Sequence, residues 1–307
     1  MSRMAHRPMC SAGATSTEPY IFTRNDPFDR SVPVQLVARK LLKSGEFMRN
    51  IRHFQVPDDA LAIWFLGQNG FIVKASGSPL IGIDLYLTDS CSSAFPDRPY
   101  RLDRQLPIFI EPEDLDVDVF ITTHSHQDHA DPETIRRIRK DAGTRFLGPF
   151  DSIGVYEQCG VDASKCEIIH PGQTRDFDKS VSVLGTFALP TDATDLNHIG
   201  LLLRFANQLT FYNSGDTAFA EVLATLLPKD VDICAICING GFRNLSAMEA
   251  AAIVKLVRPR VVIPCHYDMM INNVGSPEMM RVALELADSD ASFFQMRYYE
   301  PLIYQRA

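Results

Sequence analysis

The stretch Thr123-His124-Ser125-His126-Gln127-Asp128-His129-Ala130-Asp131 places three imidazoles and a carboxylate within six residues. Such a cluster is typical of metal sites, because imidazole nitrogen and carboxylate oxygen are ligands of zinc, manganese and iron. Residues 117–122, just before it, alternate and then become apolar and β-branched, which predicts a strand. Asp131 is a good N-cap and Pro132 suits the first helical position, which predicts a helix. The motif therefore lies on a strand-to-helix loop.

The spacing within the motif divides its ligands between two adjacent positions. His124 and His126 can point into one site, whereas Asp128 and His129 follow them and can face a second site beside it. A bound metal lowers the pKa of a water molecule towards ~7, and an acid beside that water can act as general base. We therefore expect Asp128 to be both ligand and catalytic base. The competing interpretation, an exposed His-rich loop that binds metal by accident, is disfavoured by the strand-loop-helix context.

Composition describes an ordinary globular chain of 307 residues, 46% hydrophobic and 22% charged. No apolar run reaches the ~18 residues that a membrane span needs, and the first residues lack the apolar segment of a secretory signal. We therefore expect a cytoplasmic protein with no membrane partner. The net charge of -8 argues against a nucleic-acid partner, since phosphate binding needs a basic face.

Neither the basic residues nor the cysteines indicate a further site. The densest basic run, residues 136–140, spreads its cations over different faces of the predicted helix, so we expect a solvated surface. Seven cysteines at irregular spacings do not form a disulfide pattern. Cys234 and Cys237 lie in an apolar strand-like run, where alternation sends them to opposite faces, so both are predicted to be core residues.

The chain before the motif divides into an arm and a β-meander. Residues 1–55 are predicted to form a partly disordered N-terminal arm with one helix near residues 34–48, and residues 56–307 the main domain. Three strands follow the arm, and Asp84 closes the third; we expect it to support the site rather than to bind metal. Residues 88–112 are polar, proline-rich and aperiodic, so this long loop is expected to be functional or mobile. The meander strands are predicted over residues 61–66, 70–74 and 80–85.

The second half of the chain repeats the order of strands and then helices. Ser246 with Glu249 makes a capping box for one helix, and Ser276 before Pro277 begins another. This repetition predicts two similar halves, packed sheet on sheet with helices outside. The elements expected here are a strand-rich stretch over 181–212, a strand over 231–238, a helix over 247–256, a strand over 260–264 and a helix over 277–287.

Two later strands end in further candidate ligands. The strand at residues 209–213 is followed by Ser214-Gly215-Asp216-Thr217, where the glycine allows a tight turn and the aspartate could bridge two metals. The strand at residues 261–264 ends in Cys265-His266-Tyr267-Asp268. We expect His266 to be the partner of the second ion.

Together, HxHxDH after one strand, SGD after a later strand and a lone His after another resemble the metallo-β-lactamase superfamily. The resemblance covers about residues 61–273 and implies an α/β fold, an αββα four-layer sandwich with a metal site at one end of its two sheets. It implies one or two divalent ions, Mn²⁺ or Zn²⁺, in a hydrolase domain over residues 56–307. The implied metal ligands are His124, His126, Asp128, His129, Asp216 and His266.

Within that superfamily, the local sequence resembles the L-ascorbate-6-phosphate lactonases, most clearly at residues 62–70, 146–149, 214–217 and 261–268. This resemblance implies hydrolytic opening of the lactone of a phosphorylated sugar acid, a small anionic substrate. The loop Gly240-Gly241-Phe242-Arg243-Asn244 suits such an anion: its glycines free the backbone, a helix N-terminus follows, and Arg243 can bind a phosphate. An ordinary surface loop is the alternative.

One ligand stays open. The superfamily usually places a further His between the opening motif and SGD, but residues 188–200 offer only His198, which lies a few residues late. Asp192 or Asp195 could take that position instead, with His198 as a substrate contact or proton donor. The number of metals is open for the same reason.

Other functions would use the same scaffold. A phosphodiesterase would need the same metal site with a differently shaped pocket, and a nuclease is disfavoured by the acidic chain. A redox di-iron protein would want a carboxylate in place of His126 and a flavin partner domain. A non-catalytic metal-binding or scaffold protein would be expected to have lost ligands. Whether the chain forms a homo-oligomer is not indicated by the sequence.

Overall fold

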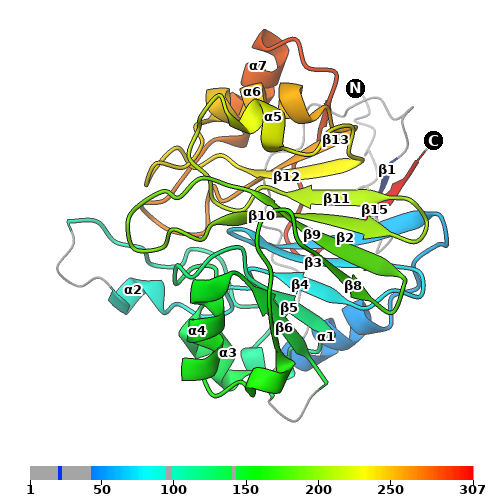
Figure 1. Cartoon of the computed structure of the whole chain (residues 1–307), viewed down its shortest axis with the longest axis vertical. Coiled ribbons are helices and arrows are strands. Elements are labelled where there is room, and N and C mark those ends of the chain that lie inside the picture. Colours follow the sequence, from blue (N-terminus) through cyan, green and yellow to red (C-terminus); the bar gives the residue numbers. More distant parts are fainter. Residues whose placement is uncertain (1–19, 23–42, 95–98, 140–142, 307) are drawn as a thin grey trace, which may run out of the picture.

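Two β-sheets face each other across the core, and helices cover both outer sides (Figure 1). This arrangement is the αββα sandwich that the sequence predicts. The computed structural model describes residues 20–22, 43–94, 99–139 and 143–306. Among these residues, no helix is both long enough and apolar enough to cross a membrane.

The first sheet contains eight strands. In chain order they are β1 (Tyr20–Phe22), β2 (Ala60–Gly67), β3 (Gly70–Ala75), β4 (Ile81–Ile83), β5 (Val119–Ile121), β6 (Arg145–Gly148), β7 (Cys166–Ile168) and β15 (Leu302–Gln305). Their spatial order is β1-β15-β2-β3-β4-β5-β6-β7. Strands β2 to β4 form the predicted antiparallel meander, and β4 to β7 are parallel.

The second sheet contains seven strands. They are β8 (Thr174–Phe177), β9 (Val181–Phe187), β10 (Ile199–Phe205), β11 (Thr210–Asn213), β12 (Ile233–Cys237), β13 (Val261–Cys265) and β14 (Ser292–Phe293). The spatial order runs from β14 to β8 in reverse chain order. Strands β8 to β11 pair antiparallel and β11 to β14 pair parallel, so each sheet joins a meander to a parallel part.

Helices lie on the outer face of each sheet (Figure 1). The first sheet is covered by α1 (Ser44–Arg52), α3 (Pro132–Arg137) and α4 (Phe150–Gln158), and the second by α5 (Leu223–Leu226), α6 (Ala247–Val257) and α7 (Pro277–Leu286). Both predicted caps of α6 and α7 are present, since Ser246 accepts from the Glu249 amide and Ser276 from the Met279 amide. Shorter helices occur at α2 (Cys91–Ala94), η1 (Pro112–Asp114) and η2 (Ala163–Lys165).

The described helix α1 overlaps only the end of the helix predicted in the N-terminal arm. It begins at Ser44 and ends at Arg52; the helix was predicted near residues 34–48, of which residues 34–42 lie outside the described part. Met48 and Ile51 are buried against the first sheet, and Arg52 forms a two-pronged ion pair with Asp118. The described part of the arm is therefore packed onto the main body.

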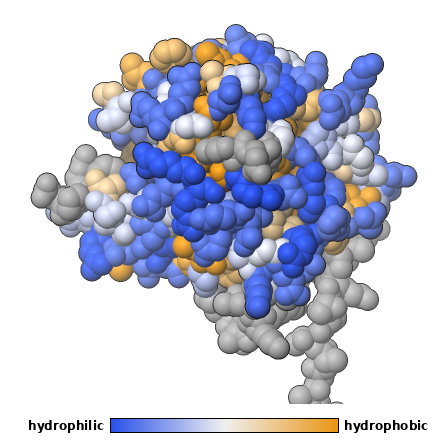
Figure 2. All heavy atoms as spheres, turned by 90° about the horizontal axis from the view of Figure 1, so that it is seen from below, coloured by the Kyte–Doolittle hydropathy of each residue, from blue (hydrophilic) through white to orange (hydrophobic). Residues whose placement is uncertain are grey.

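Strand β2 shows how the sequence divides the core. Every second residue, Leu61, Ile63 and Phe65, joins the cluster between the two sheets, and the residues between them join the cluster beneath α1, α3 and α4. Fully burying one such side chain contributes about 1.5–3 kcal/mol. Cys234 and Cys237 are fully buried core residues, as expected, in a cluster that also includes residues of α5, α6 and α7. On the surface, the face drawn in Figure 2 is mostly hydrophilic, with hydrophobic residues gathered in smaller areas.

Two hydrogen bonds and one close backbone approach join the two sheets at the end where the site lies. The amide of Ile199, at the start of β10, donates to the carbonyl of Thr123 at 3.0 Å. The amide of His266, directly after β13, donates to the carbonyl of Gln68 at 2.6 Å. Gly215 packs close to both sheets, because a Cβ there would lie 2.6 Å from the Ile199 carbonyl oxygen of the second sheet and 3.0 Å from the Cβ of Thr123, which follows β5 of the first. The loops after β5, β11 and β13 therefore meet at one edge of the sandwich.

Candidate metal centre

The loop that carries the opening motif is held by its own hydrogen bonds. Asp131 caps α3 as predicted, accepting from the amides of Glu133 and Thr134. The carbonyl of His126 accepts from the amide of His129 at 2.9 Å, which turns the chain sharply between the two residues. This turn lets imidazoles from one short loop face two neighbouring positions.

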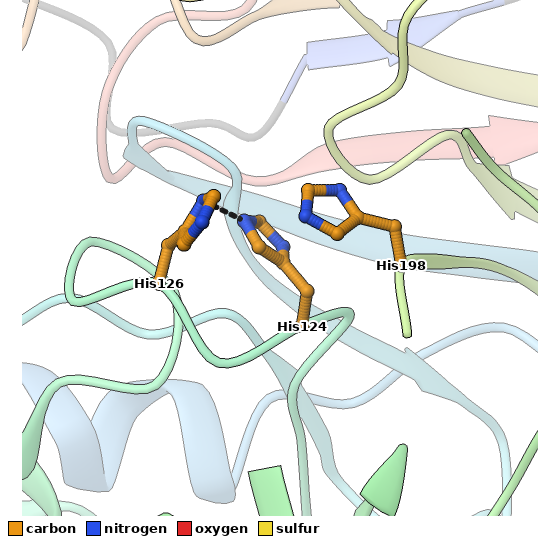
Figure 3. Close-up of side chains that lie close together, drawn as sticks. All are labelled: His124, His126 and His198. Atoms are coloured by element: carbon orange, nitrogen blue, oxygen red, sulfur yellow. Dashed lines mark hydrogen bonds between the residues drawn. The ribbon is translucent and has the colours of Figure 1, made fainter. Parts of the chain in front are cut away.

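The first of these positions is lined by three imidazoles, His124, His126 and His198, which we call the first group (Figure 3). Their ligand atoms all lie within 4.8 Å of one another. His124 Nε2 is 3.0 Å from His126 Nδ1, and the rings of His124 and His198 have centroids 4.0 Å apart. His198 directly precedes β10, whose first amide bonds to the motif loop, and this brings it to the centre.

Contacts on the far side of each ring orient the first group. His198 Nδ1 donates to the backbone carbonyl of Asp216 at 3.0 Å, so its Nε2 carries the lone pair that faces the centre. His126 Nε2 lies 3.0 Å from the hydroxyl of Thr194 and 3.4 Å from a carboxylate oxygen of Asp192. Such outer contacts fix the ring and its tautomer in metal sites.

The two aspartates that competed with His198 in the sequence have other contacts. Asp192 touches His126 on the nitrogen that points away from His124, and it accepts from the hydroxyl of Thr194 at 2.6 Å. Asp195 accepts from the backbone amides of Ser125 at 2.7 Å and of Asn197 at 2.6 Å, which joins two loops. Neither belongs to a described group of ligand atoms, whereas His198 does.

Asp128, His129 and His266 form the second group, whose ligand atoms also lie within 4.8 Å of one another. Oδ2 of Asp128 is 3.2 Å from His266 Nε2 and 3.6 Å from His129 Nε2. Oδ1 of Asp216 lies 3.3 Å from His266 Nε2 and 3.4 Å from His129 Nε2, and Asp216 also groups with His124 and His129. Asp216 therefore stands between the two groups, where a bridging carboxylate was expected.

A divalent cation fits this donor set. His129 Nε2, His198 Nε2 and Asp216 Oδ1 all face the centre, and within the described residues each is buried without a hydrogen-bond partner. Leaving a polar atom buried and unpaired costs about 1–3 kcal/mol. Ions bound at the two groups would pair these atoms, and nitrogen with carboxylate oxygen suits zinc, manganese or iron.

The charges in the centre also favour a cation. Burial, helped by His129 and His198, lowers the pKa of His124 well below its ordinary value, so this ring stays neutral and able to bind metal. Burial opposes the charge on Asp128, yet His129 and other imidazoles lower its pKa. Burial likewise opposes the charge on His129, but Asp216 and Asp128 raise its pKa well above the ordinary value. Ionised carboxylates thus lie beside imidazoles in a buried space.

Asp84 supports the centre from outside, as the sequence indicates. Its Oδ2 accepts from His129 Nδ1 at 2.7 Å, from Asn69 Nδ2 at 2.6 Å and from the Thr123 hydroxyl at 2.6 Å. Because Nδ1 of His129 is occupied, Nε2 is the atom turned to the centre. Asp84 has a positive φ of 44°, an uncommon conformation for a non-glycine residue that often marks functional sites.

Sequence reasoning missed two buried amides that touch the site carboxylates. Gln68 Nε2 donates to Asp128 Oδ2 at 2.6 Å, and Asn244 Nδ2 donates to Asp216 Oδ2 at 2.5 Å. The available signal was the polar pair Gln68-Asn69 between two apolar strands, at the edge where the motif strand ends. Their partners are distant in sequence, so no spacing pattern indicates these contacts.

Arg243 is the one proposed site residue that the structure does not bring into the centre. Its side chain is exposed, and no described contact connects it to either group. The backbone around it is unusual, with positive φ at Gly240, Phe242 and Arg243. The neighbouring Asn244 connects this loop to Asp216 instead. An anion-binding role for Arg243 stays a prediction.

Comparison with known proteins agrees with this geometry. Residues 62–266 match the family model of the beta-lactamase superfamily domain. The chain belongs to the metallo-β-lactamase superfamily. It is 24% identical over 294 residues to the probable L-ascorbate-6-phosphate lactonase UlaG of Escherichia coli O127:H6, a match that covers 83% of this chain and 82% of the relative. Family and donor set together make the chain a metal-dependent hydrolase of this superfamily.

Solved structures share the fold at lower identity. Igni18, a metallo hydrolase from Ignicoccus hospitalis KIN4/I, superposes with a TM-score of 0.62 at 19% identity, covering 81% of this chain and 100% of that one. A possible metal-dependent hydrolase from Veillonella parvula DSM 2008 gives 0.63 at 16% identity, covering 78% and 98%. These likenesses confirm the αββα sandwich.

Proposed function

We propose that this hydrolase uses metal-activated water to open a lactone ring in a small anionic substrate, a phosphorylated sugar acid. The hydrolytic part of this proposal is supported by one observation: the first and second groups of ligand side chains lie next to each other in one centre. The lactone part is supported by the similarity to a probable L-ascorbate-6-phosphate lactonase over 83% of the chain.

The residues of the centre divide the work of hydrolysis. Divalent ions held by the two groups and Asp216 would lower the pKa of a water molecule towards ~7 and polarise the substrate carbonyl. Asp128 receives the proton of that water, since neighbouring imidazoles keep its carboxylate ionised. Gln68 holds the accepting carboxylate in place, and Asp84 keeps His129 turned to the centre. His198 would act as a ligand, because its Nδ1 is held by the Asp216 carbonyl and its unpaired Nε2 faces the other imidazoles of the first group.

The phosphate of the substrate would bind at the loop of Arg243. This loop lies beside the long loop at residues 88–112, because Phe242 contacts Tyr100 with ring centroids 5.3 Å apart. Arg243 is exposed and directly precedes Asn244, which contacts Asp216, and its guanidinium can bind a phosphate through two hydrogen bonds. Arg243→Ala should therefore raise KM for a phosphorylated lactone and leave KM for the unphosphorylated lactone unchanged. Arg204, exposed towards the far end of β10, gives the matched control Arg204→Ala.

The test of the reaction measures bound metal and turnover on a panel of lactones and on a generic phosphodiester. Wild type should open lactones, and Asp128→Asn, which keeps the shape but loses the base, should lose about 10²–10⁴-fold in kcat. Wild-type turnover in Asp128→Asn would refute the assigned base. Cleavage of the phosphodiester alone would favour a phosphodiesterase, and metal binding without any turnover would favour a scaffold protein.

A further inference from the structure

Two amide side chains in the centre share an unusual arrangement. Gln68 and Asn244 are both buried, and each donates from its nitrogen to one site carboxylate. The oxygen of each amide is buried without a hydrogen-bond partner among the described residues. Burying an amide oxygen without a partner costs free energy, so the position of each amide is explained by the hydrogen bond from its nitrogen to the carboxylate.

Asn244 determines which oxygen of Asp216 faces the metals. Its Nδ2 is 2.5 Å from Asp216 Oδ2, so this oxygen is already paired. The other oxygen, Oδ1, points between His129 and His266 at 3.4 and 3.3 Å and has no hydrogen-bond partner. Asp216 can therefore meet the ions through a single oxygen, in a position that Asn244 keeps constant.

Gln68 holds Asp128 in a comparable way from the other sheet. Its Nε2 is 2.6 Å from Asp128 Oδ2 and 3.1 Å from His266 Nε2. The backbone carbonyl of Gln68 accepts from the backbone amide of His266, so the β2–β3 turn contacts Asp128 and His266, two of the three residues of the second group. Gln68 has a positive φ of 54°, a strained conformation for a residue with a side chain.

The first group is oriented by different partners. His126 contacts the hydroxyl of Thr194, His124 Nδ1 lies 3.1 Å from the hydroxyl of Thr123, and His198 donates to a backbone carbonyl. None of these contacts involves Gln68 or Asn244. His198 contacts the backbone carbonyl of Asp216 and not the carboxylate that Asn244 holds, so removing either amide leaves these ring contacts of the first group in place.

We propose that Gln68 and Asn244 are positioning residues that hold Asp128 and Asp216 for a second ion, while the first group binds its ion without them. The proposal rests only on the metal-dependent part of the proposed function. Its test contains no substrate, so a failure of the lactone assignment leaves the result interpretable.

The experiment titrates the metal-free full chain with Mn²⁺ and with Zn²⁺ by calorimetry and measures bound metal by elemental analysis. Gln68→Met and Asn244→Leu remove the amides at nearly constant volume, and Asn244→Ala replaces the leucine variant if that does not fold. Asn239→Leu is the control: Asn239 is a buried amide in the same loop with an unpaired oxygen, but it donates to Asn273 rather than to a carboxylate. Thermal unfolding of each metal-free variant reports on the fold.

Wild type and Asn239→Leu should bind two ions per chain. In the Gln68 and Asn244 variants, affinity for one ion should fall about 10- to 100-fold, the usual effect of removing a partner of a metal ligand, and affinity for the other should stay. Binding of only one ion by wild type would overturn the proposal. Equal weakening of both ions, or the same loss in Asn239→Leu, would also overturn it, because the amides would then only support the fold.

Discussion

Replacing His198 and Asp192 in turn separates two of the three candidates for the ligand that the sequence leaves open. His198→Ala deletes one of the three imidazoles in the first group, whereas Thr194→Val deletes an outer contact of another, His126. The structure therefore predicts a large loss of metal affinity for the first change and a small one for the second. Asp192→Ala should resemble Thr194→Val, since Asp192 also touches only His126.

The magnitudes follow from the geometry. A four-ligand zinc site binds with roughly 10–16 kcal/mol, or about 2.5–4 kcal/mol per ligand, so losing His198 should cost roughly 100- to 1,000-fold in affinity. Outer contacts usually contribute 10–100-fold. Thr194→Val should lie near the lower end, about 10-fold, because the His126 side chain is 23% exposed and water can replace the hydroxyl.

The assay is a competition titration of the metal-free protein with Zn²⁺ against a chelator of known affinity, followed by thermal unfolding without metal. All three variants should unfold near the wild-type temperature, since the changes lie at the edge of the sandwich. If Asp192→Ala weakened binding as much as His198→Ala, Asp192 would be the ligand and the assignment of His198 would be wrong.

Three further outcomes follow from contacts described above. Asp84→Asn should weaken the ion of the second group about 10- to 100-fold in the same titration, because His129 loses its carboxylate partner; unchanged affinity would mean that Asp84 only supports the turn. Gly215→Ala should lower the free energy of unfolding in urea by about 1–3 kcal/mol, because φ is 58° and the new Cβ would lie 2.6 Å from a carbonyl oxygen; an unchanged urea midpoint would contradict this. For Asp232, burial opposes ionisation, but hydrogen bonds from Arg306 and Thr210 lower the pKa of its carboxyl group. Its contribution to folding stability is therefore present above the unfolded pKa of about 3.9 and is lost as the pH falls through the folded pKa. The stability difference between wild type and Asp232→Asn should shrink below about pH 4, and a pH-independent difference would refute the shift.

Much of the fold was predictable because its strands carry a regular pattern. Strand β2 alternates between two clusters and is buried on both faces, so its apolar run could be recognised without knowing its neighbours. Asp131 and Ser246 cap helices through contacts within three residues, which are visible in sequence. Strand β15 was not predicted, because its four residues are too few to show a period and its partners come from the start of the chain.

The candidate site was predictable where ligands follow strands and not where contacts cross between loops. The residues of the opening motif, Asp216 and His266 each sit directly after a strand, and parallel strands deliver their ends to one edge. The role of His198 depended on how residues 188–198 fold over Ser125, which only the three-dimensional path shows. Gln68 and Asn244 reach their carboxylates from other loops, and a polar residue in a turn is common without any such role.

Strand β15 also bears on how the protein is made. Leu302 lies opposite Ile63, so the strand that pairs with β2 on one side comes from the far end of the described chain. At about 5–20 residues per second, a ribosome needs roughly 10 to 50 s after finishing β2 to supply its partner. During that interval one edge of an apolar strand stays unpaired, and such an edge can pair with another nascent chain. Because β15 is synthesised last, we expect the nascent chain to need a chaperone while β2 is unpaired. Variants that weaken β15 should therefore aggregate during synthesis, before a loss of metal binding can be measured.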